Sequence, residues 1–539
     1  MFEFSQEPMP THSIPYKDTG YFTKLICDYL DERDNLKPFY NRFPSLKNFK
    51  LQIEEKQQDF TEEKRHLLAK RIMFQYGDNS LSQSTLSNID LLKEHTTFTI
   101  TTGHQLNLFT GPLYFLYKIF SAINLSEQLK KEYPKFHFVP VYWMATEDHD
   151  FEEINHFNLF GKKIEWNRES AGAVGELSTE GLKEIKQRLK KEFGESEHGK
   201  KLAGYFSEAY TKNSNLADAT RYLANMLFYH HGLVIVDGND EELKKCFIPY
   251  AEKELIENLS FKEISKTTER LTDLDFPEQV HPREINLFYL KENLRERIIE
   301  RDHRFYINET DISFSKEEII SELHEHPERF SPNALLRPLY EEVILPNLCY
   351  IGGGGELAYW FQLKDYFEKV EVTFPILLLR NSALLVPQRL IKKLQKLDSG
   401  IEEMFLPQHE LITRHTYEKS KIDIDFSKQK KYLSKQFKDL YKLAEKTDAS
   451  FLGAVRAQEK KQLNGLDHLE KRLLKAQKRN LSDELDRLRN IQDELFPNQS
   501  LQERQLNFSE FYLEYGEDLL DLLKENLEPL DMRFTVFEL

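Results

Sequence analysis

A glycine and a histidine stand side by side in Thr101-Thr102-Gly103-His104, and this pair of residue types suits a phosphate site. Glycine lets a backbone approach a ligand closely, and a neighbouring imidazole can donate a hydrogen bond to the same anion. We therefore expect His104 to be catalytic, and Gly103 and Gln105 to bind substrate or nucleotide. The alternative is a loop histidine that bonds only to nearby backbone.

Four titratable residues follow one another in Glu147-Asp148-His149-Asp150. Such neighbours repel one another unless a cation, a proton or the amides of a helix relieve them. If the preceding strand continued, Asp148 and Asp150 would project to the same side, as a general base or a set of metal ligands would require. We name Asp148, His149 and Asp150 as catalytic candidates and assign no residue to a resident metal. The alternative is that Asp150 and the acids after it cap a helix.

A run of glycines, Gly352 to Gly355, precedes Glu356. Consecutive glycines between a strand and a helix expose backbone amides to an anion. No Gly-Lys-Ser/Thr follows, so the run is not a Walker loop, and its spacing does not match the dinucleotide fingerprint. We expect Gly352, Gly353 and Glu356 to form an anion or substrate cradle, with close packing of backbone as the alternative.

Two arginines at the borders of predicted elements could bind carboxylates. They are Arg337 and Arg380, and Asn381 follows the second. A guanidinium can grip a carboxylate through two parallel hydrogen bonds. We expect all three residues to bind substrate; the alternative for each arginine is an ion pair with one of the chain's own acids.

A parallel sheet would place these motifs at one edge. Apolar, β-prone runs predict buried strands, and amphipathic or charged runs between them predict helices. The strands are expected at 98–101, 136–145, 233–237, 349–351 and 374–379, and helices at 113–129, 240–258 and 357–367. This alternation predicts a doubly wound α/β core, which binds ligands at the carboxyl ends of its strands. Residue 104, residues 147–150 and residues 352–355 should then face one cleft.

Other stretches lack this alternation of strands and helices, and they divide the chain into domains and insertions. We expect a core over 1–384, interrupted by a helical insertion at about 179–230 and a mixed one at about 261–345. Residues 385–500 should form a helical coiled-coil domain, and 501–539 should return to the core. Four leucines recur every seven residues, as a coiled coil requires: Leu474, Leu481, Leu488 and Leu495. Heptads do not say whether the partner helix comes from the same chain or from a second subunit.

Composition narrows the class of protein. The 539 residues contain 74 Lys and Arg against 90 Asp and Glu, a net charge of −16, which argues against nucleic acid as a partner. Three cysteines without a Cys-x-x-Cys pair suggest neither a disulfide framework nor a thiolate zinc site. The chain has no signal-like start and no apolar run approaching about 18 residues, so we expect a cytoplasmic protein with no membrane partner.

Several stretches together resemble the bacillithiol biosynthesis family of cysteine-adding enzymes. They are residues 102–114, 147–156, 330–340, 350–360 and 502–504, so the resemblance covers essentially the full chain. The motif at 101–104 is also similar to the Thr/His-x-Gly-His signature of nucleotidyltransferases and class I aminoacyl-tRNA synthetases. No second signature of the Lys-Met-Ser-Lys-Ser type accompanies it.

The family resemblance implies a Rossmann-like core, two connecting-peptide insertions and a coiled-coil domain that pairs two subunits into a homodimer. It implies a ligase that joins the carboxyl group of cysteine to the amine of glucosaminyl-malate. Because a free carboxylate does not readily form an amide, ATP or another nucleotide is the expected activator, with Mg²⁺ as an accompanying ion.

The resemblance also suggests a role for each site residue. Gly103 and His104 would hold phosphates, one member of the acidic motif would take the proton of the amine, and Arg337 and Arg380 would bind the malate carboxylates. Two other functions remain open: a nucleotidyltransferase-like enzyme that activates another carboxylate, and a non-catalytic coiled-coil assembly protein with a nucleotide-binding core.

Overall fold

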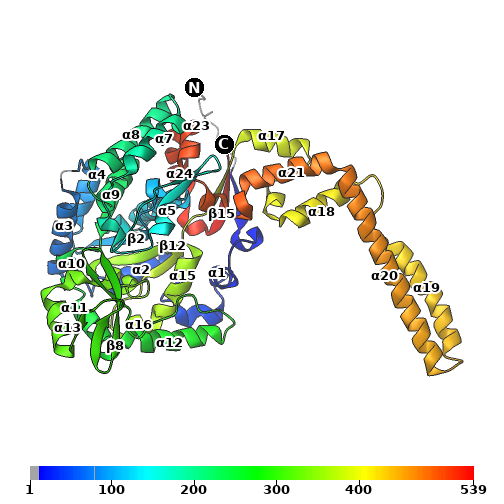
Figure 1. Ribbon diagram of the computed structural model, residues 1–539, viewed down its shortest axis with the longest axis horizontal. Coiled ribbons are helices and arrows are strands. Elements are labelled where there is room, and N and C mark those ends of the chain that lie inside the picture. The colour runs from blue at the N-terminus through cyan, green and yellow to red at the C-terminus, as the bar shows by residue number, and fades with distance from the viewer. Residues whose placement is uncertain (1–10, 78) are drawn as a thin grey trace. The chain divides into compact units, whose positions relative to one another are not determined.

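The computed structural model describes residues 11–77 and 79–539, which divide into two compact units. The core unit contains residues 12–383 and 503–535, and the helical unit contains 384–502 and 536–539 (Figure 1). The chain therefore leaves the core unit after residue 383 and returns to it at residue 503.

A five-stranded sheet forms the centre of the core unit, in the order β13-β12-β2-β3-β6, and its neighbouring strands are all parallel. The strands are β2 (Thr97–His104), β3 (His137–Met144), β6 (Val234–Asp237), β12 (Asn347–Gly352) and β13 (Ile376–Leu379). Their side chains are almost entirely buried, as expected for a sheet covered on both faces. The strand order reverses direction between β2 and β12, which is where such folds bind ligands. The predicted doubly wound parallel core is thus confirmed.

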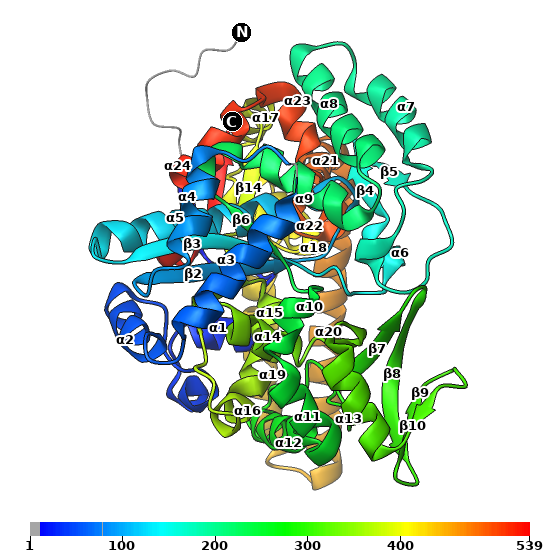
Figure 2. The same cartoon turned by 90° about the vertical axis from the view of Figure 1, so that its left-hand side faces the viewer.

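Helices connect and cover these strands. The longest connection is α5 (Tyr114–Glu132), which links β2 to β3 and packs on both. Further connections are α9 (Leu216–Leu227) before β6, α14 (Arg337–Ile344) before β12, and α15 (Gly354–Trp360) and α16 (Lys364–Lys369) before β13. Figure 2 shows β2 and β3 with α3 and α5 close to them. Further helices of the core unit are α1 (Lys24–Leu30), α2 (Leu46–Lys56), α3 (Glu62–Tyr76), α4 (Gln83–Leu91), α6 (Phe151–Ile154), α12 (Leu259–Thr272), α23 (Ser509–Tyr515) and α24 (Asp518–Asn526).

Element boundaries differ from the prediction in two places. Strand β2 continues through His104, so this histidine ends a strand rather than beginning a loop. The helix expected over 240–258 is two helices, α10 (Glu241–Lys245) and α11 (Ile248–Glu257). The break coincides with Pro249, which lacks the N–H group that a continuous helix would need there.

Two insertions interrupt the core unit. The first contains α7 (Leu182–Phe193) and α8 (Glu197–Lys212), which pack on each other, and α8 packs on α9. The second contains an antiparallel sheet in the order β10-β9-β8-β7-β11. Figure 2 shows β7 to β10 of this sheet. Its strands are β7 (Leu287–Lys291), β8 (Leu294–Arg301), β9 (Arg304–Ile307), β10 (Ser313–Phe314) and β11 (Phe330–Pro332). Helix α13 (Lys316–Glu325) follows β10 and begins with a capping box between Ser315 and Glu318.

The helical unit contains the helices expected of a coiled-coil domain. They are α17 (Gln388–Lys396), α18 (Gln408–Lys419), α19 (Ser427–Ala444), α20 (Ala449–Asn480) and α21 (Ser482–Leu495). Helices α19 and α20 form a hairpin within one chain, and Phe437, Ala444 and Val455 are buried between them (Figure 1). The leucine repeat breaks at Leu481, where α20 ends and α21 begins. Among residues 11–77 and 79–539, no helix is both long enough and apolar enough to cross a membrane.

Candidate functional site

A cavity of about 320 Å³ lies at the carboxyl ends of β2, β3 and β12, on the core unit alone. This volume is in the range of sites for small molecules. The cavity is lined by Gly103 and His104 at the end of β2, by Asp148 after β3, and by Gly353 and Gly355 after β12. The structure thus brings the three predicted motifs to one cleft.

His104 is only 6% exposed, and its ring packs against Tyr114 and Phe115, with centroids 5.5 and 5.0 Å away. Burial, and after it the charge of Lys118, lowers the pKa of His104 well below its usual value. The ring is therefore neutral at pH 7. Its Nε2 atom has no hydrogen-bond partner among the described residues, so a ligand in the cavity could supply one.

A network around Glu356 joins the strands that form the cavity. Lys118 Nζ lies 2.6 Å from the Glu356 carboxylate and donates to the Gly103 carbonyl, also at 2.6 Å. The Tyr350 hydroxyl and the Gly353 N–H donate to the two Glu356 oxygens at 2.9 and 2.8 Å. Glu356, which was predicted to bind substrate, therefore holds β2, α5, β12 and α15 together at the site.

Asp148 lines the cavity as an ion-pair partner of Arg337. Burial acts to raise the pKa of Asp148, but the neighbouring cations, chiefly Arg337 and then Arg295, together outweigh it and the pKa is lowered. A carboxylate held in its charged form is a weak proton acceptor near neutral pH. The geometry does not favour Asp148 as the general base.

The other two catalytic candidates of the acidic motif lie outside the cavity lining. His149 Nδ1 is 2.6 Å from Arg295 Nη1, and its ring lies against Phe288. Asp150 is exposed and precedes α6 without a side-chain cap bond. The condition for Asp148 and Asp150 to share a side, that the strand continues through them, is not met, because β3 ends at Met144 and the chain turns before the motif.

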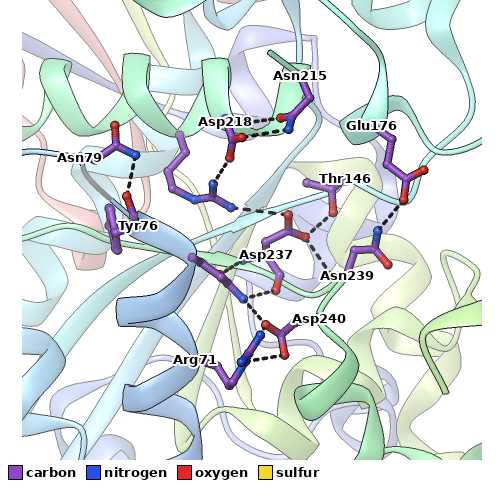
Figure 3. Close-up of polar contacts among 12 residues, drawn as sticks. Arg71, Tyr76, Asn79, Thr146, Glu176, Asn215, Asp218, Asp237, Asn239 and Asp240 are labelled. Carbon is purple, nitrogen blue, oxygen red and sulfur yellow. Dashed lines mark hydrogen bonds and ion pairs between the residues drawn. The ribbon is translucent and has the colours of Figure 1, made fainter. Parts of the chain in front are cut away.

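A polar network fixes the loop that carries Asp148 (Figure 3). The Thr146 hydroxyl donates to Asp237 at 2.5 Å, and Arg221 lies 3.5 Å from the same carboxylate. Next to it, Arg71 Nε binds both oxygens of Asp240 at 3.0 Å (Figure 3). The Thr146–Asp237 bond anchors the end of β3 to the end of β6, and the Arg71–Asp240 pair anchors α3 to the start of α10.

Arg380 also lines the cavity, but most of its guanidinium is already bound. Its Nη2 lies 2.7 Å from Glu503, and its Nη1 donates to the Asn381 carbonyl and the Ser382 hydroxyl at 2.8 and 3.0 Å. Arg337 and Arg380 therefore both pair with acids of the chain. Such ion pairs were the alternative to the prediction that both arginines bind the malate carboxylates.

Three more predicted ligands can now be placed. Gln105 lines the cavity, and its Nε2 donates to Glu153 at 2.9 Å. Gly352 is buried in β12 and does not line the cavity, unlike Gly353. Asn381 is also outside the lining: it accepts from the Ser121 hydroxyl at 2.9 Å and donates to the Glu528 carbonyl at 3.0 Å. Its contacts are those of a structural residue.

Three charged residues of the cavity were not predicted as site residues: Lys118, Glu341 and Arg504. Lys118 is a lone charge within the apolar part of α5, which is a signal that could have identified it. Glu341 lies four residues after Arg337, so both project from the same face of α14. Arg504 arrives from the segment that returns to the core unit, and only the family resemblance pointed to it.

No group of three or more His, Cys, Asp or Glu side chains within residues 11–77 and 79–539 is arranged to hold a metal ion. The donors of the cavity are instead an imidazole, a lysine and three arginines, which suit anionic groups.

Two family models match the chain almost from end to end. Residues 9–381 match the bacillithiol biosynthesis BshC N-terminal Rossmann-like domain, and residues 383–539 match the BshC C-terminal coiled-coil domain. Proteins named "Putative cysteine ligase BshC" are similar over nearly their whole length. The protein from Christiangramia forsetii is 57% identical, covering 98% of this chain and 99% of the relative. The one from Flavobacterium johnsoniae is 56% identical with the same coverage, and one from Bacillus cereus is 27% identical over 96% of this chain and 98% of the relative.

Proposed function

Because the chain belongs to the bacillithiol biosynthesis BshC family, we propose that it is a ligase that joins the carboxyl group of L-cysteine to the amine of glucosaminyl-malate. The observation that carries the proposal is the cavity, which collects anion-binding groups at the switch point of the sheet. The reaction would proceed through an activated cysteinyl carboxylate. The cytoplasm is the proposed location, and the three free cysteines accord with a reducing compartment.

ATP or another nucleotide would supply the activation of the carboxylate. Its phosphates fit the part of the cavity that contains His104, Lys118 and Gly353, because the Lys118 ammonium gives two of its three N–H groups to Glu356 and Gly103 and keeps the third for an anion. Lys118 would stabilise the negative charge that develops on the reacting group, and the unpaired Nε2 of the neutral His104 ring would accept a hydrogen bond from the ligand. We propose that Mg²⁺ enters with the nucleotide as the counter-ion of its phosphates.

The malate carboxylates need a cation that is not already neutralised. Arg504 lines the cavity and has no acidic partner within ion-pair distance among the described residues, in contrast to Arg337 and Arg380. We therefore assign a malate carboxylate to Arg504. Asp148, held as a carboxylate, is placed to accept a hydrogen bond from the attacking amine.

The test is to incubate the purified protein with glucosaminyl-malate, cysteine and ATP, and to identify the product by mass spectrometry. We expect the cysteinyl conjugate, and its loss when the nucleotide is omitted. A conjugate formed with another amino acid in preference to cysteine would support a different carboxylate-activating enzyme. An unchanged yield from His104→Ala would refute the role proposed for His104. A non-catalytic assembly protein would form no conjugate under any of these conditions. Absence of product with ATP and also with a chemically activated cysteine would refute the proposal.

A further inference from the structure

Most charges in the cavity are already paired within the protein. Lys118 pairs with Glu356, Arg337 with Asp148, and Arg380 with Glu503. When these three pairs are set aside, two charged residues of the lining are left without an ion-pair partner among the described residues. One is the cation Arg504 and the other is the acid Glu341.

Glu341 is held in an unusual state for a buried acid. It lies on α14 and is 3% exposed, and its Oε2 atom has no hydrogen-bond partner among the described residues. The next residue, Glu342, is equally buried but has hydrogen-bond partners within the protein. It accepts from Lys56 at 2.9 Å and from Asn347 at 2.6 Å. An unpaired buried oxygen on the wall of a cavity indicates a partner that comes from outside the protein.

We propose that Glu341 is the subsite for the α-ammonium group of the amino-acid substrate. This inference rests on the proposed function and adds to it the part of cysteine that does not react. Cysteine carries a carboxylate, which must be activated, and an ammonium group, which must not compete as a nucleophile. Tyr350 and Tyr359 line the same cavity.

The charges that face Glu341 come from three helices. Burial raises the pKa of Glu341 well above its usual range; Glu342 and Glu356 act in the same direction, and Arg337 and Lys118 oppose them. These surroundings favour the neutral acid of Glu341 in the free protein. When an ammonium group arrives, its positive charge favours the carboxylate, and the proton of Glu341 leaves to solvent. The ammonium keeps its own proton beside the carboxylate and stays non-nucleophilic.

Calorimetry can measure this proton. Cysteine is titrated into the full-length protein with a non-hydrolysable ATP analogue present, at pH 7, in two buffers of different ionisation enthalpy. We expect wild type to release about one proton per cysteine bound, and Glu341→Gln to release none and to bind cysteine about tenfold or more weakly. We expect 3-mercaptopropionate, which lacks the ammonium group, to bind both proteins with similar affinity.

A matched control is Glu254→Gln. Glu254 is also a buried acid with a raised pKa, but it lies outside the cavity and accepts from Ser260 and Asn286. This variant should lose stability and keep proton release. Cysteine binding without proton release in wild type, or unchanged release in Glu341→Gln, overturns the inference alone. A wild-type protein that binds no cysteine overturns the proposed function as well.

Discussion

Arg504 differs from the other cations of the cavity in being exposed and lacking an acidic partner among the described residues. A hydrogen bond to a charged group contributes about 1.5–3 kcal/mol, so losing it should weaken binding of the malate-bearing substrate about tenfold to a hundredfold. We predict that Arg504→Ala raises KM for glucosaminyl-malate by this factor and changes kcat little. Steady-state kinetics measures both.

Arg533→Ala is the control for this prediction. Arg533 belongs to the same returning segment, is exposed and pairs with Asp531. It should leave both constants unchanged. A fall in kcat with constant KM in Arg504→Ala would contradict a purely binding role.

At the scale of residues, the sequence identified the groups whose backbone position depends on a strand end. His104, Asp148 and Gly353 were placed correctly in one cavity because each follows a recognisable buried strand. The sequence could not show which charged side chains form ion pairs with one another. Glu503 lies 123 residues beyond Arg380, and nothing local indicates that the two side chains meet.

The loop after β2 connects the cavity residues Gly103, His104 and Gln105 to α5. Phe109, Thr110 and Gly111 all have positive φ, which costs energy in residues other than glycine. Asn507 holds this loop by donating to the Phe109 and Gly111 carbonyls at 2.8 and 2.6 Å, and Tyr210 accepts from the Phe109 N–H at 2.8 Å. Three successive left-handed residues persist because other segments fix them.

We predict that Asn507→Ala destabilises the protein by about 2–4 kcal/mol, because it leaves two buried carbonyls without a donor. Urea denaturation measures the change. Asn526→Ala, which removes one bond within α24, is the control and should cost about 1 kcal/mol or less. Equal losses in the two variants would argue against a special role for the loop.

Another contact between elements should depend on pH. Glu510 on α23 accepts from the Phe160 N–H at 2.6 Å, at the turn between β4 (His156–Leu159) and β5 (Lys162–Glu165). Burial raises the pKa of Glu510 from 4.5 to about 6. The folded state therefore holds the proton more tightly than the unfolded state. This contribution to stability is complete below about pH 4.5 and is lost as the pH rises through 6.

We predict that, as the pH rises from 4.5 to 8, wild type loses roughly 1–2 kcal/mol of stability that Glu510→Gln keeps, because glutamine does not titrate. Urea midpoints of both proteins at the two pH values give the difference. Glu514→Gln, on an exposed position of the same helix, should show no such trend. A difference between wild type and Glu510→Gln that is the same at both pH values would rule out titration of this group.

At the scale of elements, apolar periodicity predicted the five central strands, the helical insertion and the antiparallel strands of the second insertion. The strand ends were less accurate, since β2 runs on through His104. Hydrophobic patterns stop where side chains become polar, whereas backbone pairing of β2 with β3 continues to the pair His104 and Met144.

For the whole molecule, the homodimer stays a prediction, and the helical unit offers a surface to test it. Tyr432 is 70% exposed and Leu469 is 52% exposed, and both line a groove along the α19–α20 hairpin. Exposed apolar side chains of this size are typical of an interface. We predict that wild type sediments with twice the mass of one chain and that Leu469→Glu sediments as a monomer.

Lys475→Glu, an exposed position on the same helix, should leave the mass unchanged. Analytical ultracentrifugation measures all three proteins, and circular dichroism checks that Leu469→Glu keeps its helices. If wild type is a monomer at micromolar concentration, a homodimer formed through this groove is refuted.

The division of the chain has a consequence for its synthesis. Arg380 is made with the first part of the core unit, but Glu503 follows only after about 120 further residues of the helical unit. At roughly 5–20 residues per second, a ribosome needs about 6–24 s for that stretch. During this interval the nascent core carries a guanidinium whose counter-charge does not yet exist. The wall of the cavity that contains Arg504 is therefore synthesised last. A transcript cut short before codon 503 would yield a core unit that is nearly complete in length but lacks this wall of its site.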